Sequence, residues 1–384
     1  MKVKIGDLTK IKTGKLDANA SSEDGQYPFF TCSKEPLKIS TYSYDCECVL
    51  VAGNGDLNVK YYNGKFDAYQ RTYIIENNSD GKLYMPYLYL FMEEYVEELR
   101  RQAIGGVIKY IKLGNLTDAM IELPSVEEQR NIVKILFKAK QILEQREIEL
   151  EKLDELIKAR FVEMFGNPDV NEKNWNVYKM EQLCEVGSSK RIYQNDQSLT
   201  GIPFLRISDL VNRMDTGSKD CDLFIPEELF EKFKKQGLVP ARGDILLTAR
   251  GTLGRCYIIQ DDDEFYFQDG MITWLSKYDE RITPLYISCL FEMPEFRKQI
   301  DSLQAGSTVA YLSISMTKEL NVMVPPLELQ NQFAAFVAQT DKSKFDIHKF
   351  LYCTSNNTQS IIKPRPNTKE SGKTRGGKLY ADEF

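Results

Sequence analysis

The strongest constraint on the fold is that the chain repeats itself. At an offset of 201 residues, the segment 105–111 aligns with 306–312 without a gap. The residues that recur as identities at matching positions are Gly105, Tyr110, Pro124, Glu127 and Gln129. The offset falls to about 196 for 49–55 against 245–251 and to about 175 near the start, as expected if insertions separate matching strands. Because a period near 200 is too long for a solenoid, the repeat predicts a duplicated domain, each copy followed by a connector.

Each copy combines strand-like and helix-like segments. Branched and aromatic residues are dense in segments that indicate strands, namely 45–51, 66–75, 243–248 and 265–275. The segments 85–99 and 284–300 have the apolar spacing of amphipathic helices. Each copy is therefore expected to be a mixed domain of short strands and a few helices.

The connector after the first copy has a different composition. From 126 to 163 it contains neither Gly nor Pro, and its apolar residues follow 4–3 spacing, which predicts one helix of roughly 55 Å. Ser125 is placed to cap this helix, and Gly166 to end it. A lone helix with one apolar seam must bury that seam, and the second connector repeats the pattern from Pro325 to about Leu351. We therefore expect an α+β fold of two similar mixed α/β domains joined by long antiparallel coiled-coil helices, with pseudo-twofold symmetry.

These patterns divide the chain into five parts. The predicted parts are a first domain at 1–123, a central helix at 124–167, a second domain at 168–324, a shortened second helix at 325–351 and a disordered tail at 352–384. Because the second helix is shorter than the first, the distal seam of the central helix, from about Leu150 to Phe161, is expected to lack a cover within the chain. Self-association through this seam, pairing with another subunit, and a truncated or recombined chain are open alternatives.

The composition excludes several classes of function. A single histidine, His348, argues against Ser-His-Asp and Cys-His nucleophiles, His-rich zinc sites and HNH-type nucleases. The eight cysteines form no CxxC pair, and no stretch approaches the ~18 consecutive apolar residues of a membrane span. Without a signal-peptide pattern at the N-terminus, we expect a cytoplasmic protein with reduced thiols. No segment has a complete phosphate-binding loop, dinucleotide fingerprint or methylation motif, so we expect no cofactor, metal or catalytic residue in this chain.

Two similar domains joined by a helix suit a long partner with two separated contact patches, and double-stranded DNA is the natural candidate. The net charge of −6 excludes a uniformly basic coat, so contact must come from local groups. In the first domain, 58–72 interleaves basic, aromatic and amide side chains that suit a loop facing a DNA groove. These candidates are Lys60, Tyr62, Lys65, Tyr69, Gln70 and Arg71. The alternative is a β-hairpin with its tyrosines in the core and its lysines in solvent.

The second domain has its own candidates for DNA contact. They are Lys190, Arg191, Arg206, Arg250, Thr252, Arg255 and Gln268. Arg250 and Arg255 flank a glycine turn that permits close approach to phosphate, although a plain strand turn is nearly as good an interpretation. The recurring loops add Lys109, Thr308 and Tyr311, with a shared structural turn as the alternative. The acidic run 261–264 is interpreted as a solvated turn rather than a metal site.

The repeated segments also resemble a known family. The sequences Leu-Pro-Ser-Val-Glu-Glu-Gln-Arg at 123–130 and Val-Pro-Pro-Leu-Glu-Leu-Gln-Asn at 324–331 look like the conserved regions of type I restriction–modification specificity subunits. So do the segments 65–71 and 242–254. The resemblance covers roughly residues 1–350, in the order that the family has them.

The resemblance implies that each domain is a target recognition domain that contacts one half of a bipartite DNA site. The helices would set the spacing and dock two methyltransferase subunits, which bind S-adenosylmethionine. A restriction and translocase subunit that uses ATP and Mg would join them, and the chain itself would catalyse nothing. Two alternatives stay open: a fragment of a single-chain restriction and methylation enzyme, and a coiled-coil scaffold for protein interactions without a DNA role.

Overall fold

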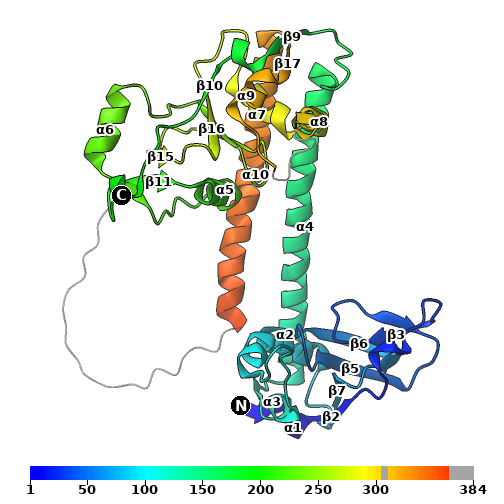
Figure 1. The fold of residues 1–384 in the computed structure, drawn as a ribbon. Helices are drawn as coiled ribbons and strands as arrows, with labels where there is room; N and C mark the ends of the chain where they lie inside the picture. The colour runs from blue at the N-terminus through cyan, green and yellow to red at the C-terminus, as the bar shows by residue number, and fades with distance from the viewer. Residues whose placement is uncertain (304–309, 363–384) are drawn as a thin grey trace. The chain divides into compact units, whose positions relative to one another are not determined.

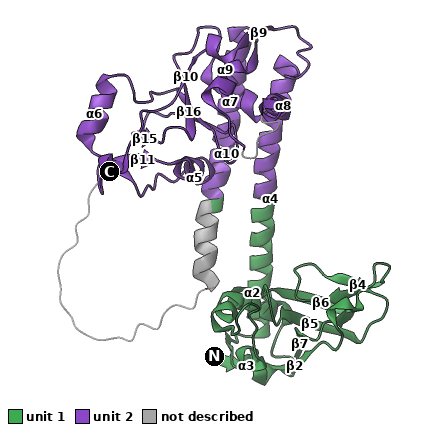
Figure 2. Ribbon diagram, viewed as in Figure 1, with its two compact units in different colours: residues 1–146, 351–384 green, residues 147–350 purple. Residues whose placement is uncertain are grey.

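The computed structural model describes residues 1–303 and 310–362, and of residues 352–362 it describes the backbone alone (Figure 1). Two compact units form: unit 1 contains residues 1–146 and those from Leu351 on, and unit 2 contains residues 147–350 (Figure 2). Each unit mixes helices with sheets, so the predicted α+β class is confirmed. None of the helices in the described ranges combines the length and the apolar content that a membrane crossing requires.

Unit 1 is built on a six-stranded sheet. Its strands lie in the order β2-β7-β5-β6-β3-β4, and neighbours are antiparallel except for β3 and β6. A separate antiparallel pair, β1 with β8, joins the start of the unit to its end. The elements are β1 (Lys2–Lys4), α1 (Ile5–Leu8), β2 (Thr9–Thr13), η1 (Ala18–Ala20), β3 (Tyr27–Phe30), β4 (Leu37–Ile39), β5 (Tyr44–Ala52), β6 (Val59–Ala68), β7 (Thr72–Asn77), α2 (Met85–Gln102), α3 (Leu113–Thr117) and β8 (Met120–Glu122).

The centre of this sheet is buried on both faces, because successive side chains of a strand point to opposite sides. In β5, Val49 and Val51 enter the core that α2 covers, whereas Cys48 and Leu50 enter a second core on the other face. Helix α2 contributes residues spaced by four and three, namely Leu88, Met92, Val96 and Leu99. The continuous apolar run at 48–52 therefore reflects a strand between two cores.

Unit 2 carries the same strand pairings in two smaller sheets. The order β10-β16-β13-β14 is antiparallel, and the order β12-β11-β15 contains the parallel pair β11 and β15. Strands β9 and β17 pair as β1 and β8 do in unit 1. The elements are β9 (Asn176–Lys179), η2 (Met180–Gln182), β10 (Glu185–Gly187), η3 (Gln194–Asp196), β11 (Ile202–Leu205), α5 (Ile207–Thr216), β12 (Phe224–Ile225), α6 (Glu227–Lys235), β13 (Ile245–Thr248), β14 (Cys256–Ile258), β15 (Tyr266–Phe267), β16 (Ile272–Ser276), α7 (Pro284–Glu292), α8 (Pro294–Leu303), α9 (Ile314–Glu319) and β17 (Asn321–Val324).

The strand pairings explain why the offset of the repeat drifts. Phe30 in β3 and Leu205 in β11 hold equivalent places 175 residues apart, whereas Val51 in β5 and Leu247 in β13 are 196 apart. The additional residues of unit 2 form α5 and α6, for which unit 1 has no helical counterpart between β3 and β5. The change of offset is therefore an insertion between matching strands, as predicted.

A single long helix, α4 (Val126–Phe165), begins in unit 1 and ends in unit 2. The Glu128 N–H donates to Ser125 Oγ at 3.3 Å, and the Ser125 N–H donates to the Glu128 carboxylate at 2.9 Å, which is the predicted capping box. The Ser125 hydroxyl also donates to the Glu128 carboxylate, at 2.7 Å, and this bond together with the one from the Ser125 N–H lowers the pKa of the Glu128 carboxyl. At the other end, Gly166 has φ of +83°, a conformation that suits glycine after a helix. Both predicted ends of the helix match the structure.

Within unit 2, the end of α4 packs antiparallel against the beginning of α10 (Leu327–Ile362). Phe161 lies edge-on to Phe333 with ring centres 5.6 Å apart, and Lys344 donates to Asp154 at 2.5 Å. The expectation that the seam from about 150 to 161 lacks a cover is therefore wrong, because an antiparallel partner covers the end of α4 with its own first turns. Self-association was expected only because this seam of α4 was predicted to be uncovered, so that expectation loses its support.

The second long helix is not shortened to Leu351. α10 continues to Ile362, and no Gly or Pro occurs between Pro326 and Pro364 to interrupt it. Proline disfavours the helical conformation of the residue before it, in keeping with a helix that ends at Ile362. The part of the predicted disordered tail from 352 to 362 is thus helical, and the remainder lies outside the described residues.

The segment 284–300, predicted as one helix, forms two. α7 ends at Glu292 and α8 begins at Pro294. Proline has no N–H to donate to the preceding turn, but it suits the first position of a new helix. The amphipathic pattern continues across the break because both helices bury residues, including Leu290 and Phe296, in the same core.

Candidate nucleic-acid interface

Three loops of unit 1 form one surface. They are the segments 53–55, 69–71 and 104–110, together called the unit 1 loop surface below. The Gly53 N–H donates to the Arg71 carbonyl at 2.8 Å, and the Gly55 N–H donates to the Lys109 carbonyl at 3.0 Å. A Cβ on Gly53 would lie 2.4 Å from the Arg71 carbonyl oxygen, so this close approach requires glycine. Backbone contacts thus fix three segments that are distant in sequence as one surface.

Four of the predicted DNA-contacting residues lie on the unit 1 loop surface. They are Tyr69, Gln70, Arg71 and Lys109. Arg71 and Lys109 are exposed, and neither has a salt bridge within the part of the chain that the structure describes. Gln70 is also exposed, and its Nε2 donates to Asp17 at 2.8 Å. Exposed cations and amides are the groups that contact phosphates and base edges.

The other three predicted residues of unit 1 lie on a strand. Lys60, Tyr62 and Lys65 belong to β6, which forms the hairpin with β5 that was the alternative interpretation. The Tyr62 ring lies 5.1 Å from the Phe30 ring, between centres, at the edge of the core. Burial lowers the pKa of Lys60. The expected groove-facing loop is therefore wrong for 58–68, whose mixture of aromatic and polar residues is that of a half-buried strand.

Unit 2 has an equivalent surface. It consists of the segments 249–251 and 268–270 with Tyr311, together called the unit 2 loop surface below. The Ala249 N–H donates to Met271 O at 2.9 Å, and the Ala249 carbonyl accepts from the Leu312 N–H at 3.0 Å. In unit 1, Gly53 makes the same two bonds, with Arg71 at 2.8 Å and Ile111 at 2.9 Å. The two surfaces therefore share one backbone framework.

The unit 2 loop surface brings three predicted residues together. Arg250 forms a β-bridge with Tyr311, and its guanidinium lies 5.1 Å from the centre of the Tyr311 ring. Gln268 is half-buried in the neighbouring turn, and Thr252 is exposed in the turn between β13 and β14. Thr308 lies outside the described residues.

Three predicted arginines of unit 2 are paired with carboxylates. The pairs are Arg191 with Asp269 at 2.9 Å, Arg206 with Asp209 at 3.0 Å and Arg255 with Asp215 at 2.6 Å. The hydrogen bond from Arg255 lowers the pKa of the Asp215 carboxyl. A paired arginine must exchange its carboxylate for a phosphate before it can contact DNA, so Arg250 is the stronger candidate. Lys190 is exposed, and its Nζ lies 5.5 Å from the centre of the Phe233 ring.

The acidic run 261–264 is only partly the solvated turn that was expected. Asp261 and Asp262 are exposed, but the side chain of Asp263 is buried and accepts from Arg213 at 3.0 Å. It also accepts from the Tyr257 hydroxyl at 2.9 Å and from the Gln260 N–H at 2.8 Å. The run thus supplies a buried ion pair that joins α5 to the turn before β15. In the described ranges, no cluster of His, Cys, Asp or Glu could hold a metal ion.

Sequence reasoning missed two residues of the loop surfaces. Asn54 lies in the turn after β5 and forms a β-bridge with Tyr110. Two signals in the sequence could have identified them: Asn54-Gly55 is a turn dipeptide, and Tyr110 recurs as Tyr311 in the repeat.

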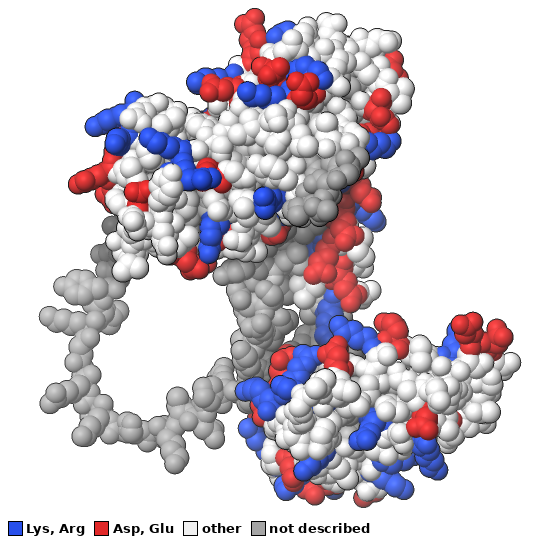
Figure 3. All heavy atoms as spheres, in the orientation of Figure 1, with Lys and Arg blue, Asp and Glu red and all other residues white. Residues whose placement is uncertain are grey.

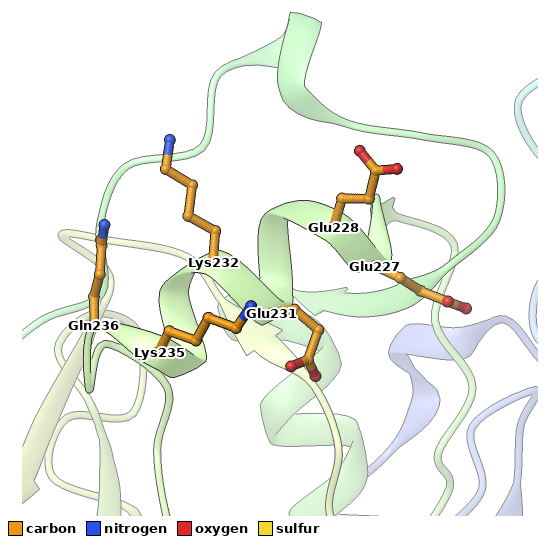
Figure 4. Close-up of a pocket in the computed structure, with 6 residues that line it drawn as sticks. All are labelled: Glu227, Glu228, Glu231, Lys232, Lys235 and Gln236. Atoms are coloured by element: carbon orange, nitrogen blue, oxygen red, sulfur yellow. The ribbon is translucent and has the colours of Figure 1, made fainter.

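A hollow on α6 does not have the character of a ligand site. It is lined by Glu227, Glu228, Glu231, Lys232, Lys235 and Gln236. Figure 4 shows these side chains fanning out from one helix without converging on a common point. All six residues are exposed, as on an ordinary solvated helix face.

Comparison with known proteins identifies the family. The family model described as type I restriction modification DNA specificity domain matches residues 1–152 and 172–352. The two matched stretches correspond to the two copies of the repeat and cover most of the chain. The chain belongs to this family. As a specificity subunit it has a non-catalytic role.

Curated relatives carry the same description. The specificity subunit of the type I restriction enzyme EcoDI from Escherichia coli is 40% identical over 156 residues, which are 41% of this chain and 34% of that relative. The putative specificity subunit S.HindORF215P from Haemophilus influenzae is 25% identical over 328 residues, which are 82% of this chain and 80% of the relative. The chain thus spans about a third of the first relative's length and most of the second's.

Solved structures from type I restriction–modification systems have a similar fold. The S subunit of the type I restriction–modification system from M. genitalium matches with a TM-score of 0.61 at 16% identity, covering 94% of each chain. A chain from a structure on the assembly and conformational transition of the type I system matches with a TM-score of 0.57 at 14% identity, covering 94% of this chain and 96% of that one. At these identities the likeness establishes the fold alone.

Proposed function

We propose that this specificity subunit recognises double-stranded DNA in the cytoplasm, and that unit 1 and unit 2 are target recognition domains for the two halves of a bipartite site. The observation that carries the proposal is that the loop surfaces recur on one backbone framework with different side chains. A shared framework with different side chains is what two domains need to contact two different base sequences in the same manner. The chain would select the site, and its partners would modify or cleave it.

Local charge supports DNA contact through the loops rather than through α4. Between 144 and 155, α4 carries six acidic and two basic residues, and Figure 3 shows acidic side chains gathered over its middle. An acidic stretch repels phosphates, whereas the exposed Arg71, Lys109 and Arg250 attract them. The long helices would therefore set the distance between the half-sites without contacting the duplex.

We further propose that exposed apolar residues of α4 dock two methyltransferase subunits. Phe137 and Ile148 are 44% and 49% exposed, and Ile135 and Leu156 are exposed as well. A partner that covered these side chains would remove apolar surface from water, which favours docking. S-adenosylmethionine, ATP and Mg would then be bound by the methyltransferase and restriction subunits.

The test uses the complex of this chain with methyltransferase subunits and a duplex that carries its site. Arg71→Ala should weaken binding and lower the salt slope by about 0.9 for the lost phosphate contact, and Arg250→Ala should do so independently. Arg242→Ala is the control, because Arg242 is exposed and lies at the opposite end of β13 from Arg250. Unchanged affinity and salt slope for both variants would contradict DNA contact through the loop surfaces.

A further inference from the structure

One position differs in chemistry between the two otherwise equivalent loop surfaces. In unit 1, Asn54 forms the β-bridge with Tyr110, and in unit 2, Arg250 forms the β-bridge with Tyr311. Each residue lies two positions after the end of the central strand. The residue before it makes the same pair of hydrogen bonds, through its N–H and its carbonyl, in both units. The backbone therefore holds Asn54 and Arg250 in the same place, and only their side chains distinguish the two units there.

Both side chains can contact a ligand, Asn54 from a half-buried position and Arg250 from an exposed one. Arg250 is exposed, lies over the Tyr311 ring and has no salt bridge among the described residues. Stacking on an aromatic face leaves the edge of a guanidinium free to donate. The Asn54 Oδ1 accepts from Cys32 Sγ at 2.9 Å, which orients the amide. The carbonyl oxygen retains a second lone pair, and the amide nitrogen donates to no atom of the described residues.

The neighbouring loop indicates that a polyanion covers this surface. From 103 to 117 the chain has two lysines, Lys109 and Lys112, and no acidic residue. At the tip of the 104–110 loop, Val107 is fully exposed and Ile108 is 62% exposed. Cations beside exposed aliphatic side chains suit a DNA groove, where phosphates meet the lysines and thymine methyl groups meet the apolar residues.

We propose that Asn54 and Arg250 are the specificity-determining residues of the two units, with Asn54 contacting an adenine and Arg250 contacting a guanine. The pairing follows from donor and acceptor geometry, since an amide matches adenine N6 and N7 and a guanidinium matches guanine O6 and N7. The inference rests on the proposed function and adds which residue of each unit selects a base and which base it selects. Each contact should give about a 5- to 150-fold preference for its base pair.

The experiment exchanges the two side chains in the complex with methyltransferase subunits. Asn54→Arg should change one position of the unit 1 half-site from A·T to G·C, and Arg250→Asn should make the reverse change in the other half-site. Competition binding against duplexes with single base-pair substitutions measures both. Asn78→Arg is the matched control, because Asn78 is an exposed asparagine of unit 1 that lies after β7, outside the loop surface.

The outcomes separate this inference from the proposed function. If the unaltered complex binds no specific site, the proposed function fails. If it binds a specific site but neither exchange changes the preferred base in its half-site, the inference on Asn54 and Arg250 is wrong. If Asn54→Arg does not fold, Arg250→Ala provides the test, because Arg250 is exposed and its replacement should not disturb folding. Loss of the preference for one guanine would support the inference, and a retained preference would overturn it.

Discussion

Replacing Gln330 by leucine should be among the most destabilising single changes in unit 2. Gln330 is 1% exposed, and its Nε2 donates to the carbonyls of Arg281 at 2.8 Å and Pro325 at 2.9 Å. Its Oε1 accepts from the Thr283 N–H at 2.9 Å. Leucine fills a similar volume but leaves these three backbone groups without partners, at about 1–3 kcal/mol each. We expect these three unpaired groups together to lower the free energy of unfolding by about 3–9 kcal/mol, a large part of a typical domain's stability.

The same change in unit 1 tests whether the duplication extends to individual hydrogen bonds. The Gln129 side chain donates to the carbonyls of Lys82 at 2.8 Å and Pro124 at 2.9 Å and accepts from the Tyr84 N–H at 2.8 Å. Urea unfolding of the full chain, followed by circular dichroism, should therefore show a similar loss for Gln129→Leu. The exposed Gln332→Leu is the control and should change the free energy by less than about 0.5 kcal/mol. A loss below about 1 kcal/mol for both buried glutamines would show that neither unit depends on these hydrogen bonds.

Three further predictions concern the ion pairs and the long helix. The side chains of Asp263 and Arg213 are 1% and 6% exposed, so Asp263→Ala leaves Arg213 buried without its partner. This change should lower the free energy of unfolding by about 3–5 kcal/mol. In the same urea titration, Asp262→Ala at an exposed pair should lower it by less than about 1 kcal/mol. Hydrogen bonds from Arg281 lower the pKa of Asp279 from 3.8 to about 2. The ionised Asp279 therefore stabilises the fold above about pH 4, and this contribution is lost as the pH falls toward 2. In Asp279→Asn, the melting temperature should depend less on pH over that interval. A pH dependence equal to that of the unaltered chain would count against the pair. Phe137→Ser should reduce the methyltransferase that co-purifies with the chain while leaving its circular dichroism spectrum intact, and full retention of the partner would argue against docking there.

The elements that could be predicted from the sequence are those that local chemistry fixes. The ends of α4 follow from the Ser125 capping box and from Gly166, which act within one turn of the helix. The duplication was visible because residues such as Gln129 and Gln330 are needed for the same buried hydrogen bonds in both units. Patterns of this kind can therefore be recognised from the sequence alone.

Two of the wrong predictions, on the α4 seam and on the acidic run 261–264, depended on contacts between segments distant in sequence. The cover of the α4 seam near Phe161 comes from Phe333, and the partner of the buried Asp263 is Arg213, 50 positions away. The pairing of Arg191 with Asp269 also joins segments from opposite sides of the insertion that holds α5 and α6. Local pattern cannot supply such partners, so basic residues that are paired and basic residues that are free look alike in the sequence.

Two equivalent units that contact two separated halves of one DNA site should leave a two-part methylation motif in the genome. Sequencing the methylated bases in the DNA of cells with and without the gene for this chain measures that motif. We expect that a motif of two short specified blocks, separated by a fixed run of unspecified bases, loses its methylation when the gene is removed. An unchanged methylation pattern, or the loss of a motif without an unspecified interval, would contradict it.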